Sequence, residues 1–300
     1  MRIIAILLVM LFCFLPLCVQ AEEDRLQIVA VNFPCYDFAR AIVQDQADVT
    51  LLIRPGMEVH TFDPTPADIV AIGNADLLVY IGGESDVWVD DVLSSLGEKA
   101  PEQIKLMDSV KLLEELEPEE ASDQPEMDEH IWTSPRNALQ MVEALLTRIC
   151  EIDPTKQMIY AEYASIYQSE IEAIDSKLIE IIENGARKEL IFADRFPFLY
   201  LAHDYGLDYK AAFLSCTAQT EPSANTVISL IQTVIQNKIP VIYTIEMSNG
   251  AIAKTIQQET GAKIEQLHSM QTITLDEFEA GDTYVSIMNR NLEAIWKGLN

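Results

Sequence analysis

The chain has 300 residues, of which 49% are hydrophobic and 23% are charged, and its formal net charge at pH 7 is −28. This length is sufficient for two compact lobes with sizeable cores. The acidic balance excludes nucleic acid as a partner, because phosphate binding needs clustered cations, and it favours a soluble exported protein whose field attracts cations.

Residues 1–21 have the features of a secretory signal. Arg2 supplies the positive start, an apolar run covers Ile3–Leu17, and a small residue, Ala21, ends an acceptable cleavage site. The apolar run is too short for a comfortable membrane span. Cys18 could carry a lipid instead, although the usual small residue before such a cysteine is missing. We expect an exported protein, in the periplasm or at the outer face of the cytoplasmic membrane.

In the first half of the chain, short β-branched runs alternate with amphipathic segments, which is the pattern of a parallel α/β sheet. The predicted strands are Ile28–Asn32, Val49–Ile53, Leu77–Ile81 and Ile104–Met107. The predicted helices cover roughly 35–45, 66–73, 86–96 and 135–151.

Glu114–Glu129 is the one low-complexity stretch, with nine acidic residues among sixteen, two prolines and no basic residue. Such a composition predicts a disordered loop that repels itself. Two interpretations remain open: a solvated linker, or an arm that gathers cations beside His130.

The segment from Thr155 to Asn184 contains neither glycine nor proline, and apolar residues recur in it at helical spacing. It predicts one helix of about 28 residues, which would be about 42 Å long at 1.5 Å per residue. Such a helix can span two lobes as a rigid connection, so we expect only modest lobe movement on binding.

The second half repeats the alternation of strands and helices. We therefore predict an N-terminal lobe at 22–153 that includes the acidic loop, a linking helix at 154–185 and a C-terminal lobe at 186–300. The predicted strands are Leu190–Phe192, Tyr209–Phe213, Val241–Ile245 and Ile264–Leu267, and the helices lie near 195–205, 222–237, 248–260 and 283–298.

Two of the four histidines, His60 and His130, lie in loops that can present an imidazole. Each precedes, by four or five residues, a hydroxyl residue followed by proline: Thr65-Pro66 and Ser134-Pro135. This pair is typical of a helix N-cap followed by proline in the first turn, and Asp68 adds the carboxylate of a capping box. Each histidine is thus predicted on a short loop fixed to a helix start, which suits a metal ligand.

Three residues of the second half directly follow predicted strands: Asp194, Glu246 and His268. In open parallel sheets, ligands bind beyond the carboxyl ends of the strands. The sequence therefore predicts a metal site in an interlobe cleft, with His60, His130, Asp194, His268 and Glu246 as ligands. For Asp194 an ion pair with Arg195 is the alternative, and Glu246 could brace the cleft without binding the metal.

Several segments resemble the zinc/manganese substrate-binding proteins of ABC transporters, and together they cover essentially all of the mature chain. The two histidine blocks are the most specific of them. The segments are Asn32-Phe33-Pro34, Pro55–Asp68, Ile81-Gly82-Gly83-Glu84, Asp128–Asn137, Thr220–Ala224, the strand ending in Glu246 and Gly281–Asn291.

The resemblance implies an α/β fold of two lobes, each a four-stranded, mostly parallel sheet flanked by helices, joined by one long helix. A single metal ion would bind in the cleft for delivery to a membrane permease. His60 and His130 match the family's two ligands in the first lobe. The family also has a histidine or glutamate after the first strand of the second lobe, where Asp194 is the nearest substitute, and an aspartate after the last strand, where this chain has His268-Ser269-Met270-Gln271.

We therefore expect a monomeric protein without catalysis that captures Zn(II), with Mn(II) as the alternative, and delivers it to an ABC permease. The histidine nitrogens favour zinc, since manganese generally prefers oxygen-rich sites. The rival functions are a surface adhesin or a metallochaperone on the same fold, and a secreted metal-dependent hydrolase. The hydrolase lacks support because the chain contains no His-Glu-x-x-His motif.

Overall fold

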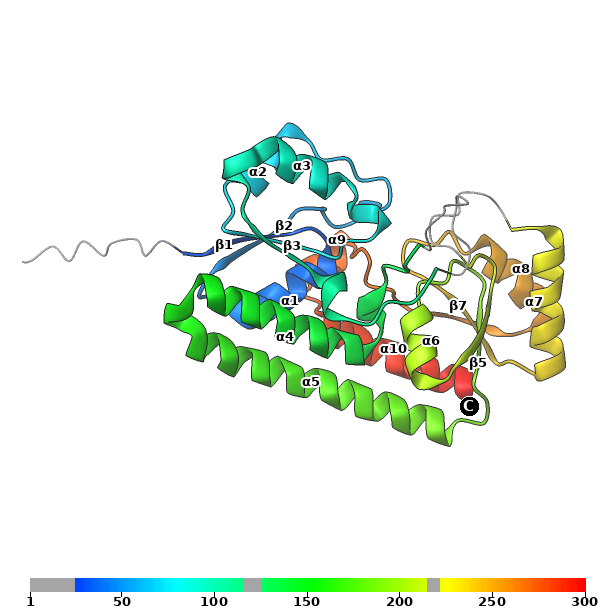
Figure 1. Cartoon of the computed structure of the whole chain (residues 1–300). Coiled ribbons are helices and arrows are strands. Elements are labelled where there is room, and N and C mark those ends of the chain that lie inside the picture. Colours follow the sequence, from blue (N-terminus) through cyan, green and yellow to red (C-terminus); the bar gives the residue numbers. More distant parts are fainter. Residues whose placement is uncertain (1–24, 116–125, 215–221) are drawn as a thin grey trace, which may run out of the picture.

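A computed structural model describes residues 25–115, 126–214 and 222–300 (Figure 1). The predicted signal at 1–21, the lipidation site at Cys18 and the central part of the acidic loop lie outside these residues. Among the helices that the model does describe, none combines the length and the apolar character needed to cross a bilayer.

The first sheet has four parallel strands in the order β2-β1-β3-β4. Its two central strands are almost entirely apolar, because helices cover both faces of the sheet. Apart from short 3₁₀ turns, its elements are β1 (Gln27–Ala30), α1 (Phe33–Val43), β2 (Asp48–Leu51), α2 (Pro66–Gly73), β3 (Leu77–Tyr80), α3 (Trp88–Leu96), β4 (Glu102–Lys105) and α4 (Pro135–Ile152).

The second sheet repeats this topology, with four parallel strands in the order β6-β5-β7-β8. The predicted fold class, two four-stranded parallel sheets flanked by helices, is therefore confirmed. The elements of this half are β5 (Glu189–Phe192), α6 (Leu199–Tyr205), β6 (Asp208–Ala211), α7 (Ala224–Asn237), β7 (Val241–Thr244), α8 (Ala251–Thr260), β8 (Lys263–Gln266), α9 (Leu275–Glu279) and α10 (Tyr284–Leu299).

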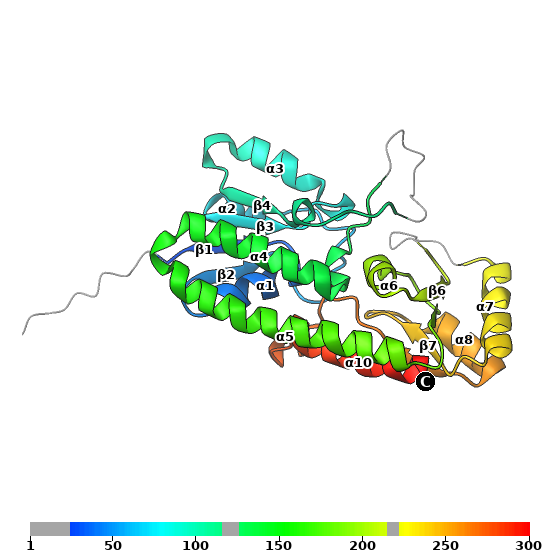
Figure 2. The same ribbon diagram turned by 60° about the horizontal axis from the view of Figure 1, so that its bottom comes forward.

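Helix α5 (Gln157–Asn184) has 28 residues, as predicted, and runs beneath both sheets (Figures 1 and 2). Its buried side chains recur at helical spacing from Tyr160 to Ile182. They belong to one continuous core that also takes in α1, α4, α10 and the inner faces of both sheets. Smaller clusters lie under α2 and α3 in the first half and under α7 and α8 in the second.

The chain returns to the first sheet after β8. The backbone N–H of Gly56 donates to the carbonyl of Ile273 at 2.7 Å, and the ring of Tyr36 packs against Phe278 of α9. At the start of α10, the N–H of Tyr284 donates to the Asp37 carboxylate at 2.8 Å. Two connections thus join the lobes: helix α5, and the segment between β8 and α10. The lobe bounds 22–153, 154–185 and 186–300 remain a prediction.

Candidate functional site

His60 lies in the loop between β2 and α2, five residues before the N-cap of that helix. The predicted capping box is present: the Thr65 hydroxyl accepts from the N–H of Asp68, and the Asp68 carboxylate accepts from the N–H of Thr65. Val59 anchors the other side of the loop in the small core beneath α2 and α3. The His60 side chain is only 11% exposed.

His130 lies just before a 3₁₀ turn (Ile131–Thr133) and α4, and its side chain is buried. Asp128 holds it in two ways, accepting from the His130 backbone N–H at 2.8 Å and contacting its Nδ1 at 3.2 Å. Pro135 occupies the first turn of α4 as predicted. Ser134 is the N-cap residue as predicted, but its side chain makes no capping hydrogen bond, because its hydroxyl donates to the Asp204 carboxylate instead.

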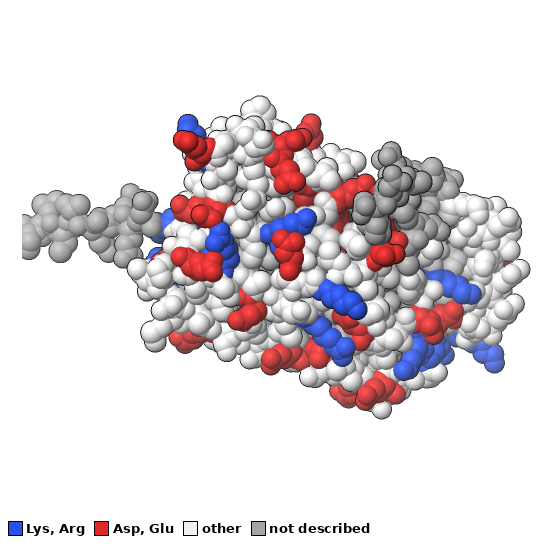
Figure 3. Space-filling model, in the orientation of Figure 1, with Lys and Arg blue, Asp and Glu red and all other residues white. Residues whose placement is uncertain are grey.

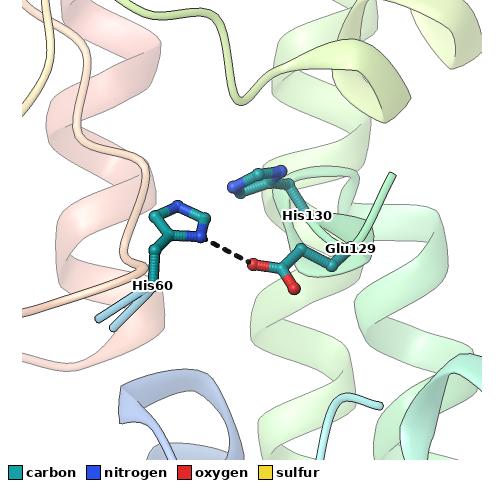
Figure 4. A group of neighbouring side chains, drawn as sticks. All are labelled: His60, Glu129 and His130. Carbon is teal, nitrogen blue, oxygen red and sulfur yellow. Dashed lines mark ion pairs between the residues drawn. The ribbon is translucent and has the colours of Figure 1, made fainter. Parts of the chain in front are cut away.

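The structure brings His60 and His130 together, with their ring centroids 6.1 Å apart. The carboxylate of Glu129 joins them, and one donor atom from each of the three residues lies within 4.8 Å of the others. In Figure 4 the two imidazoles and this carboxylate point into one space, and a dashed line marks the 3.5 Å contact between His60 Nδ1 and Glu129 Oε1. Two imidazoles and one carboxylate are a donor set suited to a borderline divalent metal ion.

Sequence reasoning did not assign Glu129 to the site, although it lies within the histidine block. Its carboxylate is buried and accepts from both the backbone N–H and the hydroxyl of Ser85, at 2.9 and 2.5 Å. Ser85 Oγ also lies 2.9 Å from His60 Nδ1. The one signal that could have identified Glu129 is its place next to His130.

Gln271, in the loop after β8, is the second residue that sequence reasoning missed. Its amide nitrogen lies 2.9 Å from His60 Nε2 and 3.3 Å from Glu129 Oε1. Because this loop packs against the first lobe, Gln271 brings a neutral polar group from the second half of the chain to the histidines.

The other three predicted ligands are not in this group. Asp194 lies after β5, where it accepts from the backbone N–H of Arg195 at 2.9 Å. Glu246 lies after β7, and its carboxylate accepts from the backbone N–H of Ser269 at 2.7 Å and from the Ser269 hydroxyl. Their assignment as ligands, like that of His268, stays a prediction.

His268 is buried between two carboxylates, with Nδ1 3.6 Å from Glu246 and Nε2 3.4 Å from Glu277. Burial alone would lower its pKa, but the two carboxylates outweigh this effect and raise it. The contact with His268 also lowers the pKa of Glu277 to about 2. His60 shows the opposite result: burial lowers its pKa, and the Glu129 carboxylate only partly offsets this. A lowered pKa favours the neutral imidazole, the form that binds metal ions.

A cleft of about 620 Å³ lies between the lobes, but His60, Glu129 and His130 are not among the residues that line it. These three line a separate, smaller cavity of about 20 Å³, together with Glu84, Glu115, Met127 and Asp128. Residues 56–59 and Gln271 line the larger cleft on one side, and Asp194, Arg195 and Glu246 line it on the other. An ion pair of 3.7 Å between Arg195 and Glu58 bridges the two sides. The predicted interlobe cleft is thus present.

The acidic loop begins and ends beside the histidines. Its two ends pair as an antiparallel bridge between Glu114 and Met127. Two carboxylates of the loop, from Glu115 and Glu126, lie close to that of Glu84 and form an acidic group with it. Over the described surface seen in Figure 3, acidic side chains are widespread and basic ones stand among them.

Comparison with known proteins gives one consistent family. Residues 28–298 match the family model described as ZnuA, zinc-uptake complex component A, periplasmic. The chain is 31% identical over 280 residues to the zinc-binding lipoprotein AdcA of Streptococcus pneumoniae, covering 91% of this chain and 56% of AdcA. It therefore spans little more than half of that relative.

A second relative and one solved structure match over nearly the full length of their chains. The high-affinity zinc uptake system protein ZnuA of Bacillus subtilis is 30% identical, covering 92% of this chain and 88% of that protein. The crystal structure of the Zn(II)-bound ZnuA-like domain of Streptococcus pneumoniae AdcA aligns with a TM-score of 0.79 and 30% identity, covering 92% of this chain and 99% of that one.

Proposed function

The chain belongs to the family of zinc-uptake complex component A, and from this premise we propose that it captures a divalent transition metal ion outside the cytoplasm and delivers it for uptake. The cargo we propose is zinc, with manganese as the alternative. The family's description as periplasmic agrees with the export signal expected at 1–21.

The observation that carries this proposal is the meeting of His60 and His130. Their loops are 70 residues apart in sequence, yet the rings lie 6.1 Å apart with the Glu129 carboxylate beside them. A zinc ion binds histidine nitrogen at about 2.0–2.1 Å, so two imidazoles of one site must approach each other closely. We assign His60 and His130 as ligands, with Glu129 supplying negative charge at the site. Asp194, Glu246 and His268 remain predicted ligands.

Nitrogen donors favour zinc over manganese at this site. The relatives point the same way, since those named above are a zinc-binding lipoprotein and a zinc uptake protein. The structure of the AdcA domain, at 30% identity, contains Zn(II). Manganese is the competitor against which selectivity should be measured.

The mechanism we propose is capture and delivery without catalysis. The neutral imidazoles of His60 and His130 bind one ion next to the cleft, and the Glu129 carboxylate supplies negative charge beside them. The lobes then tighten slightly, and the loaded protein docks as a monomer on an ABC permease. The two connections between the lobes, through α5 and through the segment leading to α10, limit the opening motion. Release follows when docking disfavours the bound arrangement.

Zinc affinity of the His60→Ala and His130→Ala variants tests this function. Competition with a chromophoric chelator should show each variant binding zinc more than about 100-fold more weakly, because loss of an outer partner of a ligand alone costs about 10–100-fold. A parallel titration should show zinc displacing manganese from the unaltered protein. Unchanged zinc affinity in both variants would remove these histidines from the site.

A further inference from the structure

This inference rests on the proposed function. We propose that Ser85 and Glu129 are positioning residues that fix the tautomer of His60, so that Nδ1 carries the proton and Nε2 carries the lone pair that binds the metal. Neither residue needs to contact the ion in this role.

Glu129, Ser85 and His60 form a chain of hydrogen bonds, which we call the relay, and the bonds around Ser85 fix its direction. An ionised carboxylate can only accept, so the Ser85 hydroxyl donates its one proton to Glu129 Oε1, at 2.5 Å. The backbone N–H of Ser85 holds the other oxygen, Oε2, at 2.9 Å. The hydroxyl oxygen then has only lone pairs to offer His60 Nδ1, 2.9 Å away, so Nδ1 must donate.

Gln271 indicates the same tautomer from the other nitrogen of the ring. Its amide nitrogen lies near both His60 Nε2 and Glu129 Oε1. Since the carboxylate oxygen can only accept, the NH₂ end of the amide faces these two atoms. His60 Nε2 is therefore an acceptor, as it must be to bind a metal ion.

The turn after β3 is shaped to admit the Glu129 side chain. A Cβ atom built on Gly83 would lie 2.3 Å from Glu129 Cβ and 2.5 Å from Oε2, which no real side chain tolerates. Asp86 fixes the turn from within, accepting from the N–H groups of Ile81 and Gly82 at 2.9 Å each. Glycine at 83 and serine at 85 thus form a cradle for this carboxylate.

His130 has the matching arrangement without an intermediary, because its Nδ1 contacts the Asp128 carboxylate directly at 3.2 Å. Carboxylates behind metal-binding histidines commonly fix the tautomer and raise the basicity of the other nitrogen. Both imidazoles would then direct Nε2 toward the same ion. The relay therefore deepens the proposed function by stating which nitrogen of His60 binds.

The second half of the chain supplies a matched control for the tautomer of His60. Ser269 holds the Glu246 carboxylate through the same pair of donors, its backbone N–H and its hydroxyl. Removing the hydroxyl at 85 or at 269 therefore deletes the same kind of bond in two places. Of these two serines, only Ser85 contacts His60.

The test is nitrogen-15 NMR of the histidine side chains in metal-free protein, combined with zinc competition titrations. The unaltered protein and Ser269→Ala should both show His60 protonated at Nδ1. Ser85→Ala should shift His60 toward the Nε2-protonated form that predominates in water, and should weaken zinc binding about 10–100-fold. Gly83→Ala, which displaces Glu129, should give the same two changes.

Three results would overturn the relay. One is a His60 protonated at Nε2 in the unaltered protein. Another is an unchanged tautomer and zinc affinity in Ser85→Ala. The third is a loss of affinity in Glu129→Gln with none in Ser85→Ala, which would make Glu129 a direct ligand. If His60→Ala still lost zinc in any of these cases, the relay would fail while the proposed function stood.

Discussion

The side-chain amide of Gln271 lies 2.9 Å from Nε2 of His60, although 211 residues separate the two in sequence. The loop after β8 therefore brings a polar but uncharged group to the imidazole nitrogen to which we assign the metal. The amide of Gln271 carries no negative charge. Among the described residues, Glu129 is therefore the carboxylate that supplies negative charge to the group it forms with His60 and His130.

Gln271→Glu should tighten zinc binding by about tenfold, equivalent to about 1.4 kcal/mol. A carboxylate in place of the amide adds negative charge and a stronger metal ligand next to His60 Nε2. Equilibrium competition with a chelator measures the change, and Thr272→Ser, in the same loop, controls for loop disturbance. Equal or weaker zinc binding in Gln271→Glu would show that this side chain does not face the ion.

Tyr284→Phe should lower the free energy of unfolding by about 1–3 kcal/mol, because it leaves a buried acceptor without its donor. The Tyr284 hydroxyl donates to the backbone carbonyl of Trp132 at 2.9 Å, which ties α10 to the segment after His130. Urea denaturation of metal-free protein measures the loss. An unchanged midpoint would mean that this bond contributes nothing to joining the lobes.

The contribution of His268 to stability should decrease as the pH rises. Its pKa is raised in the folded state, since the carboxylates of Glu246 and Glu277 outweigh the opposing effect of burial. The folded state then binds the proton more tightly than the unfolded one, whose histidine titrates near 6.5. This stabilisation is complete below about 6.5 and is lost as the pH rises through the folded-state pKa.

His268→Asn tests that dependence, because asparagine does not titrate and can accept from the N–H of Met270, as Nδ1 of the neutral His268 ring does. In chelator-treated protein, the stability difference between the unaltered chain and the variant should be larger at pH 5.5 than at pH 8.5. Glu277 is ionised at both values, since its pKa is about 2. A difference that is constant or larger at pH 8.5 would contradict the raised pKa.

Much of the fold could be predicted because each element carries its own local signal. All eight predicted strands match observed ones to within two residues at each end, and α5 has the predicted length. The starts of the helices were predicted less accurately: the helix predicted from 195 begins at Leu199, after Pro197. Helix α9, five residues long, was missed because so short a segment has no periodicity to detect.

The site could be predicted only in part, for reasons that concern side chains rather than strands. The rule that ligands lie beyond strand ends placed Glu246 and His268 at the correct edge of the sheet. It could not show that Ser269 would take up both oxygens of Glu246, or that Glu277 would face His268. Glu129 was missed because its partner Ser85 lies 44 residues away in sequence.

Anomalous diffraction at the zinc absorption edge, from crystals of the zinc-loaded protein, tests the central claim most directly. We expect one strong peak about 2.0–2.1 Å from Nε2 of His60 and of His130. A single peak elsewhere in the molecule, or a zinc ion bound to only one of these two imidazoles or through Nδ1 of His60, would contradict it.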